Sequence, residues 1–262
     1  MAPPLLWAEV IAGLFLAILS AASLQQLTYI VRRRAEIFQA WGRVTAPPLN
    51  WFDFLLYCSA CLFAAWKFPS LLPATAVGGA VLLFSAHQAS ILQFWNWKFC
   101  DLHRYLLVGL RTYFAILLPF LALTWISFAV FLKLGYNDTT QPVVKLFLEM
   151  HTRSEIIGFL VLACIIAPLW EEIVFRGMLY PFLKHKTGSG RWGPLFSMFF
   201  CAGFWSAIHQ HPPTFIPLLV LGLVLTAVYE TTGQLGYCIG LHSVFNSSTC
   251  LVLLAYKYGP HH

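Results

Sequence analysis

The chain has 262 residues, of which 59% are hydrophobic and only 10% are charged, and its mean hydropathy is +0.73. Soluble domains usually carry about 25% charged residues, so this composition excludes an ordinary water-soluble protein and predicts a polytopic membrane protein. The net charge of +6 does not indicate nucleic-acid binding, because no tract of Lys and Arg is interleaved with aromatic residues in a solvated segment. The seven cysteines lie mostly in apolar runs and imply no disulfide framework.

The first half of the chain contains four apolar segments that are long enough to cross a bilayer. A hydrocarbon core of about 30 Å takes about 20 helical residues. We expect these spans at residues 5–24, 50–66, 69–86 and 105–134. Residues 25–49 form a polar connection, and residues 87–104 combine aromatic and basic side chains in the manner typical of a membrane interface.

A polar stretch at residues 135–155 precedes a second set of apolar segments. We expect helices at residues 156–183, 192–210, 214–229 and 235–256, with Pro212 and Pro213 ending the second of them. The sequence therefore predicts an all-α fold, a polytopic transmembrane helical bundle of about eight spans with the catalytic core in the last four. It predicts one integrated membrane domain, in which residues 1–150 supply N-terminal helices and residues 151–262 carry the chemistry.

The fifth apolar segment contains two adjacent carboxylates and a guanidinium, Glu171, Glu172 and Arg176. Ionisable groups inside a membrane are costly and mark functional sites. Glu172 and Arg176 are four residues apart, so they lie on one helix face and can pair. Glu171 points about 100° away, which leaves it free to act as a base or a metal ligand. The alternative is that the cluster only fixes helix packing.

Two further polar sets occur on the later helices. His209 lies near the end of the sixth predicted helix, and His242 and Asn246 share one face of the eighth. A carboxylate and an imidazole can activate water, while a second imidazole and an amide can stabilise an oxyanion. Glu171, His209 and His242 can instead ligate a divalent metal such as zinc. No HExxH or GxSxG motif is present.

These motifs, in this order on successive membrane helices, resemble those of the CAAX prenyl endopeptidase and bacteriocin-processing (CPBP, Abi) family of intramembrane proteases. The resemblance rests on Glu171-Glu172-x-x-x-Arg176-Gly177, Trp205-x-x-x-His209 and His242-x-x-x-Asn246, and it covers about residues 156–250. It implies peptide-bond hydrolysis within the membrane. Glu171 and His209 would activate water, His242 and Asn246 would form the oxyanion site, and Glu172 and Arg176 would support them.

The resemblance also implies a membrane-associated or lipidated peptide as substrate, with a prenylated CAAX terminus in the eukaryote-like members. Two departures stand out: Trp205 replaces the more usual Phe, and His211 lies two residues beyond His209. We prefer His209, because His211 adjoins the proline pair.

Two other function classes compete with the protease. A membrane immunity or partner-binding protein would retain the polar cluster as a structural element, and an ion-coupled transporter would use Glu, Arg and His along an ion path. Transporters more often show internal repeats, and the two halves of this chain do not resemble each other. Apart from the membrane lipids and such a peptide, the sequence indicates no partner, and no cofactor is assigned beyond the metal alternative.

The basic residues Arg32, Arg33 and Arg34 predict that the first connection is cytoplasmic. With eight spans, both termini then lie outside, and residues 87–104 and 184–191 lie inside. His209 would be about 25 Å along its helix from the cytoplasmic end. Either the pocket opens on the opposite side, or one early segment does not span.

Overall fold

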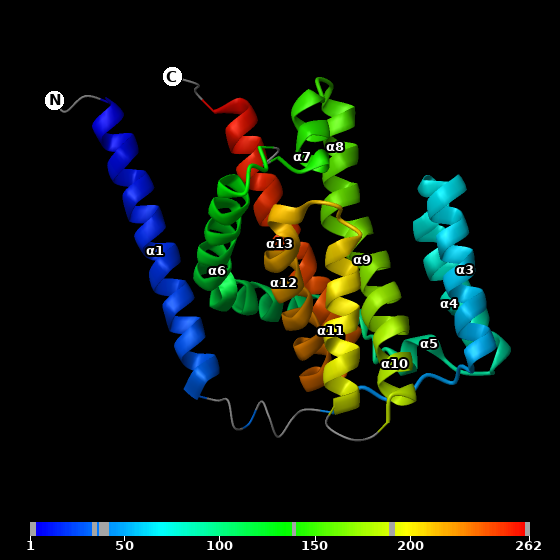
Figure 1. Cartoon of the computed structure of the whole chain (residues 1–262). Coiled ribbons are helices and arrows are strands. Elements are labelled where there is room, and N and C mark those ends of the chain that lie inside the picture. The colour runs from blue at the N-terminus through cyan, green and yellow to red at the C-terminus, as the bar shows by residue number, and fades with distance from the viewer. Residues whose placement is uncertain (1–3, 33–35, 37–41, 138–139, 189–191, 260–262) are drawn as a thin grey trace.

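The computed structural model describes residues 4–32, 36, 42–137, 140–188 and 192–259 (Figure 1). All regular secondary structure in these ranges is helical, which confirms the predicted all-α class. Five helical runs among them are long and apolar enough to cross a membrane, and the protein is a multi-pass integral membrane protein. They are Pro69–Ala86, Phe99–Lys133, Arg153–Lys186, Pro212–Thr232 and Leu235–Tyr258.

Each of the eight predicted segments lies on a helix. The long elements are α1 (Pro4–Arg32), α3 (Trp51–Lys67), α4 (Leu72–Ala86), α6 (Leu102–Lys133), the continuous run Arg153–Lys186, α11 (Trp192–Ala207), α12 (Pro212–Thr232) and α13 (Leu235–Tyr258). Short helices connect them: η1 (Pro69–Leu71), α5 (Ile91–Phe94), η2 (Phe99–Asp101) and α7 (Pro142–Glu149). Because α1, α3 and α11 are not among the five runs, the count of eight spans stays a prediction.

The first helix is longer than the hydropathy pattern indicates. It continues through Arg32, eight residues into the segment that we expected to be a polar connection. Gln and Leu favour the helical state, and the Thr28 hydroxyl donates to the Leu24 carbonyl at 2.7 Å, so the polar side chains do not end it. Arg33 and Arg34 lie outside the described residues.

The junction between α11 and α12 also differs from the prediction. Helix α11 ends at Ala207, three residues before the expected end at Gln210, and the proline pair begins the next helix. Pro212 disfavours the helical conformation at His211, which is extended with φ −130°, and Gln210 adopts φ +52°. A proline suits the first turn of a helix, because the N–H groups there have no acceptor within the helix and the missing N–H costs no hydrogen bond. The turn that carries His209 is thereby short and sharply bent.

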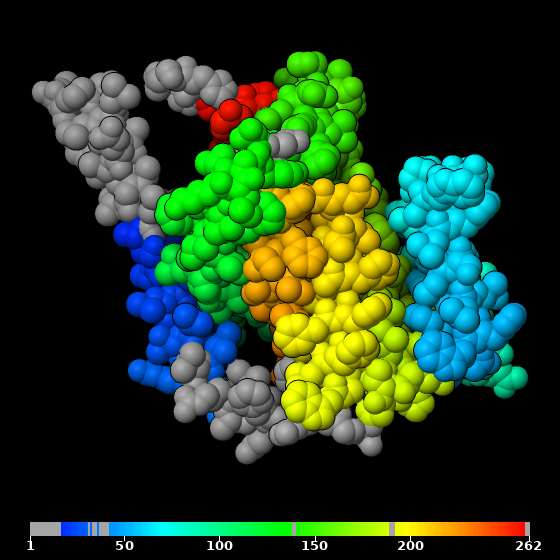
Figure 2. Space-filling model, viewed as in Figure 1, coloured from blue at the N-terminus to red at the C-terminus, as the bar shows by residue number. Residues whose placement is uncertain are grey.

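Helix α6 is the element against which the bundle is assembled. It packs against α1, α12 and α13, whereas α3 and α4 form a pair at the opposite edge of the molecule (Figures 1 and 2). Pro217, inside α12, cannot donate to the carbonyl of Pro213. The Ser127 hydroxyl of α6 donates to that carbonyl instead, at 2.7 Å.

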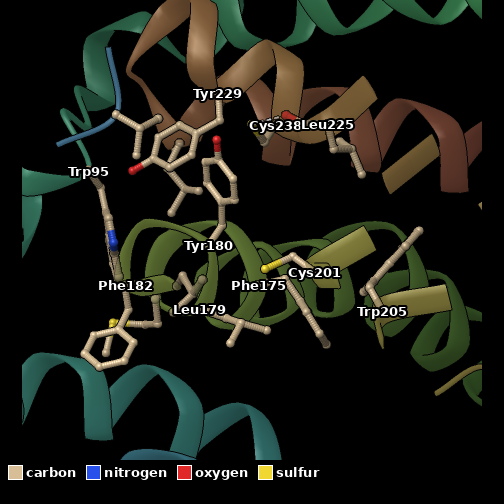
Figure 3. Close-up of a cluster of buried hydrophobic side chains, with 14 of the residues drawn as sticks. Trp95, Phe175, Leu179, Tyr180, Phe182, Cys201, Trp205, Leu225, Tyr229 and Cys238 are labelled. Atoms are coloured by element: carbon tan, nitrogen blue, oxygen red, sulfur yellow. Dashed lines mark hydrogen bonds between the residues drawn. The ribbon is translucent and has the colours of Figure 1, made fainter. Parts of the chain in front are cut away.

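The main apolar core lies between the run Arg153–Lys186 and helices α11 to α13. Trp95, Phe175, Tyr180, Tyr229 and Trp205 are among its buried side chains. Figure 3 shows them as a row with Trp95 at one end and Trp205 at the other. The Trp95 indole donates to the Gly177 carbonyl at 3.2 Å, and a Cβ on Gly177 would lie 2.8 Å from the same nitrogen. Gly177 thus leaves room for the close approach of the Trp95 ring.

Helices α6 and α13 cross at glycines. A Cβ on Gly240 would lie 2.4 Å from the Tyr105 carbonyl oxygen, and one on Gly109 would lie 2.7 Å from the Gly240 carbonyl carbon. Gly236 and Gly240 form a GxxxG pattern, which allows membrane helices to approach closely. The pattern is visible in the sequence, but we did not predict a helix crossing from it.

We predict that Gly240→Ala lowers the free energy of unfolding by about 1–3 kcal/mol, because the added methyl group meets rigid backbone and forces the helices apart. Gly78→Ala in α4 is the matched control, since a Cβ there would have nothing within 4 Å. Unfolding in detergent, followed by circular dichroism, measures both. Equal stability of the two variants would contradict the tight crossing.

Several connections meet at one end of the bundle, around the turn between α12 and α13. Leu235 N donates to Trp95 O at 3.1 Å, and Arg43 N donates to Glu230 O at 3.0 Å. Lys184 Nζ donates to Glu230 Oε1 at 2.6 Å and to Val44 O at 3.0 Å. Basic residues near this end include Arg43, Lys98, Lys184 and Lys186. His209 lies at the other end of α12.

We predict from the excess of basic residues that this end faces the cytoplasm. Cys100, which is exposed in η2 near Lys98, reports on it. In a variant that retains Cys100 as its single cysteine, a membrane-impermeant maleimide should label inverted vesicles and leave right-side-out vesicles unlabelled. The reverse labelling pattern would mean that the bundle has the opposite orientation.

Candidate functional site

One helical run, Arg153–Lys186, carries the two carboxylates and the guanidinium. It consists of α8 (Arg153–Val161), the π-helix η3 (Leu162–Ile166), α9 (Ala167–Glu172), the π-helix η4 (Ile173–Leu179) and α10 (Tyr180–Lys186). A π-helical turn contains an extra residue and changes the direction of the side chains that follow, and such turns are frequent at functional sites. Pro168 lies two residues after the end of the first of them, in the first turn of α9.

Glu172 and Arg176 pair inside the bundle, as their spacing predicts. Arg176 Nη1 donates to Glu172 Oε1 at 2.9 Å, and both side chains are 0% exposed. Arg176 Nη2 also donates to the Gly222 carbonyl of α12 at 3.1 Å. A Cβ on Gly222 would lie 3.2 Å from that nitrogen, so the glycine leaves room for the guanidinium.

His242 joins this pair from α13. Its Nδ1 lies 2.9 Å from Glu172 Oε1. A carboxylate oxygen only accepts hydrogen bonds, so Nδ1 carries the proton in this contact. The orientation of the imidazole is therefore set by Glu172, and Nε2 is the nitrogen left for other chemistry.

Glu171 has a different partner, which comes from α11. Trp205 Nε1 donates to Glu171 Oε2 at 2.7 Å. Trp205 is 1% exposed, whereas Glu171 is only partly buried. The spacing along the helix correctly separated Glu171 from Arg176, but it could not reveal a partner 34 residues further along the chain.

His209 is held by the same tryptophan residue. Its Nδ1 lies 2.8 Å from the Trp205 carbonyl oxygen, and the two rings are 4.9 Å apart between centroids. Because a carbonyl oxygen accepts, Nδ1 donates, and in the neutral ring Nε2 retains a lone pair that can accept a proton. His211 instead contacts the first turn of α12, with Nδ1 3.1 Å from Thr214 Oγ1.

The Trp205 ring links these groups to the buried ion pair. Its centroid is 5.5 Å from that of His242, with the rings perpendicular. The guanidinium carbon of Arg176 lies 5.0 Å from the Trp205 centroid. One side chain thus contacts Glu171, His209, His242 and Arg176, and brings the separate sequence motifs together.

Asn246 lies one helical turn beyond His242 on α13. Its Nδ2 donates to the Ala163 carbonyl at 2.8 Å, and Ala163 lies in the π-helix η3. An amide NH₂ has two donors, so the second N–H is available after this bond is made. The structure does not bring Asn246 into hydrogen-bonding contact with Glu171 among the described residues.

A metal site is the alternative use that the sequence predicts for these side chains. Among the residues with described positions, no three His, Cys, Asp or Glu side chains are grouped so that they could hold an ion. Glu171, His209 and His242, the ligands expected if a metal is used, therefore do not form a ready-made three-ligand site in this arrangement.

A pocket of about 460 Å³ adjoins the turn that carries His209. Its walls are mostly apolar and come from α6, α11 and α12. The lining residues are Phe131, Ser206, Ala207, Gln210, His211, Pro212, Phe215 and Ile216. The Ser206 hydroxyl donates to the Phe215 carbonyl at 2.6 Å, which is consistent with a structural rather than a nucleophilic role.

Part of the chain is similar to known proteins. Residues 153–248 match the model of a protease family, described as type II CAAX prenyl endopeptidase Rce1-like. The family resemblance predicted from the sequence is confirmed over this part of the chain. The matched segment contains Glu171, Glu172, Arg176, His209, His242 and Asn246.

A protein from Lactococcus lactis subsp. cremoris, described as the UPF0177 protein in the abiGi 5′ region, is 34% identical over 91 residues. The alignment covers 34% of this chain and 35% of that protein, so the chain spans about a third of the length of the curated relative it matches. No solved structure matches.

We predict that Arg176→Ala destabilises the fold by about 3–5 kcal/mol, because it leaves the Glu172 carboxylate buried without its guanidinium. Arg104→Ala is the control, since Arg104 pairs with Asp101 at 3.2 Å but its side chain is 64% exposed. Removing that surface pair should cost less than about 1 kcal/mol. Thermal unfolding in detergent tests both variants. A small effect at Arg176 would show that the buried pair does not hold the bundle together.

Proposed function

We propose that this protein is an intramembrane endopeptidase of the CAAX type, which hydrolyses a peptide bond of a membrane-associated substrate. The observation that carries the proposal is the contact of Trp205 with both Glu171 and His209. One residue thus holds both a carboxylate, through its indole N–H, and an imidazole with an available Nε2, through its backbone carbonyl. The protease family matched by residues 153–248 supports the same chemistry.

In the proposed reaction, Glu171 accepts a proton from a water molecule whose oxygen attacks the scissile carbonyl carbon. The carbonyl π bond becomes an oxyanion, which His242 Nε2–H and the second Asn246 N–H stabilise. Collapse of the tetrahedral intermediate re-forms the carbonyl and breaks the C–N bond. The proton that Glu171 removed from the water passes to the lone pair of His209 Nε2, which delivers it to the leaving amine, so that Glu171 and His209 both return to their starting states.

The roles of Glu172 and Arg176 in this proposal are structural. Glu172 holds Nδ1–H of His242 and lies next to the positive charge that His242 carries when Nε2 is also protonated. Arg176 keeps Glu172 in place and shares its charge. We further propose that residues 151–262 carry the chemistry and that residues 1–150 provide the surrounding membrane helices.

The substrate that we propose is a lipidated peptide, specifically one with a prenylated CAAX terminus from which the last three residues are removed. The description of the matched family supports this substrate class. The apolar pocket beside the His209 turn supports it as well, because it offers a water-poor surface for a hydrocarbon group next to the polar cluster.

We predict that Glu171→Gln lowers the cleavage rate of farnesylated CAAX peptides by about 10²–10⁴-fold, because an amide cannot accept the proton of water. The fold should be unchanged, since Gln keeps an oxygen that accepts from the Trp205 indole. Purified protein in detergent, incubated with a panel of lipidated and unmodified peptides, gives the measurement.

The matched control is Glu149→Gln, which makes the same change at an exposed glutamate at the end of α7 and should cleave like wild type. A chelator in parallel reactions decides whether a metal takes part. If folded wild type cleaves no peptide in the panel, the membrane immunity or binding alternative replaces the protease.

A further inference from the structure

The Trp205 side chain has two separable properties, an aromatic ring and an indole N–H. The ring is packed in the core and contacts His209, His242 and the Arg176 guanidinium. Any aromatic side chain would supply much of that packing. The N–H supplies something else, a hydrogen bond of 2.7 Å to Glu171 Oε2.

We infer that the Trp205 indole N–H is a positioning element for the Glu171 carboxylate, an inference that rests on the proposed hydrolysis. Glu171 is attached to its helix by a chain of rotatable bonds, and a buried ring on α11 holds one of its oxygens in place. The other oxygen, Oε1, is then presented to the reacting water. Positioning of this kind accounts for a large share of a catalytic rate, since a displacement of about 1 Å can cost about 100-fold.

The same residue fixes the relative placement of the base and the acid. The Trp205 carbonyl accepts from His209 Nδ1, and the Trp205 indole donates to Glu171. Both groups are therefore held by one residue, which is 1% exposed. The neighbouring ionisable groups are Glu172, Arg176 and His242, and Glu172 binds the other two. Trp205 therefore gives Glu171 a neutral donor, and the guanidinium remains bound to Glu172.

The test removes the N–H and keeps the ring. Trp205→Phe removes the donor and some volume, while replacement of Trp205 by β-(3-benzothienyl)alanine retains the two-ring shape and removes only the N–H. Both changes should lower kcat by about 10- to 100-fold and leave KM for the peptide nearly unchanged.

Trp125→Phe is the matched control, since Trp125 on α6 is 74% exposed and should cleave like wild type. A packing role for Trp205 would instead leave kcat of the benzothienyl variant at the wild-type value, because that variant keeps the two-ring shape. If the benzothienyl variant retains the wild-type kcat, the inference is wrong, although the proposed function stands.

A second readout does not depend on cleavage. The indole ¹⁵N–¹H resonance of Trp205, identified by its loss in Trp205→Phe, should change its chemical shift in Glu171→Ala, which removes the acceptor of the hydrogen bond. If wild type is inactive but this resonance moves in Glu171→Ala, the contact stands and the proposed function fails. An indole resonance that is identical in wild type and Glu171→Ala overturns the contact itself.

Discussion

Glu172 Oε1 accepts hydrogen bonds from both Arg176 and His242, each at 2.9 Å, in the interior of a membrane bundle. This carboxylate joins the central helical run to α13, and Arg176 extends the connection to the Gly222 carbonyl of α12. A charge in such a place is tolerated only when it is paired and hydrogen-bonded. Glu172 Oε2 and Arg176 Nε have no hydrogen-bond partner within the described ranges, so the cluster depends on the bonds made by Glu172 Oε1 and by the two terminal nitrogens of Arg176.

The two adjacent glutamates illustrate how environment divides identical side chains. Glu172 is fully buried and bound to a guanidinium and an imidazole, an environment that suits a structural role. Glu171, one residue earlier, accepts from a neutral indole and is partly exposed. Pairs of titratable groups in contrasting surroundings are a common basis for division of roles in active sites. The helical rotation of about 100° between neighbours creates the contrast.

The parts of the structure that depend on local spacing were predictable. Apolar runs located the eight helical segments, and a separation of four residues predicted the contact between Glu172 and Arg176. Contacts between distant segments were not predictable, because spacing along one helix does not determine the rotation of another. The bond from His242 to Glu172 spans 70 residues, and that from Trp205 to Glu171 spans 34. Helix α11 ends early because Pro212 disfavours the helical conformation at His211. This restriction is visible in the sequence, but we expected the two prolines to end the preceding helix at Gln210, whereas they begin the next one.

The segment matched by the family does not build the site alone. Helix α6, which lies outside that segment, crosses α13 at Gly240, less than one turn before His242. The same helix satisfies the Pro213 carbonyl through Ser127, just beyond the turn that carries His209. The glycine contacts bring the backbones of α6 and α13 together, which fixes their spacing. Pro217 leaves the Pro213 carbonyl without its helical donor, so the bond from Ser127 ties α12 to α6. Helix α6 therefore constrains the positions of both elements that carry a histidine. Helix α6, from the N-terminal part of the chain, thus constrains the positions of candidate residues that all lie in the matched segment 153–248.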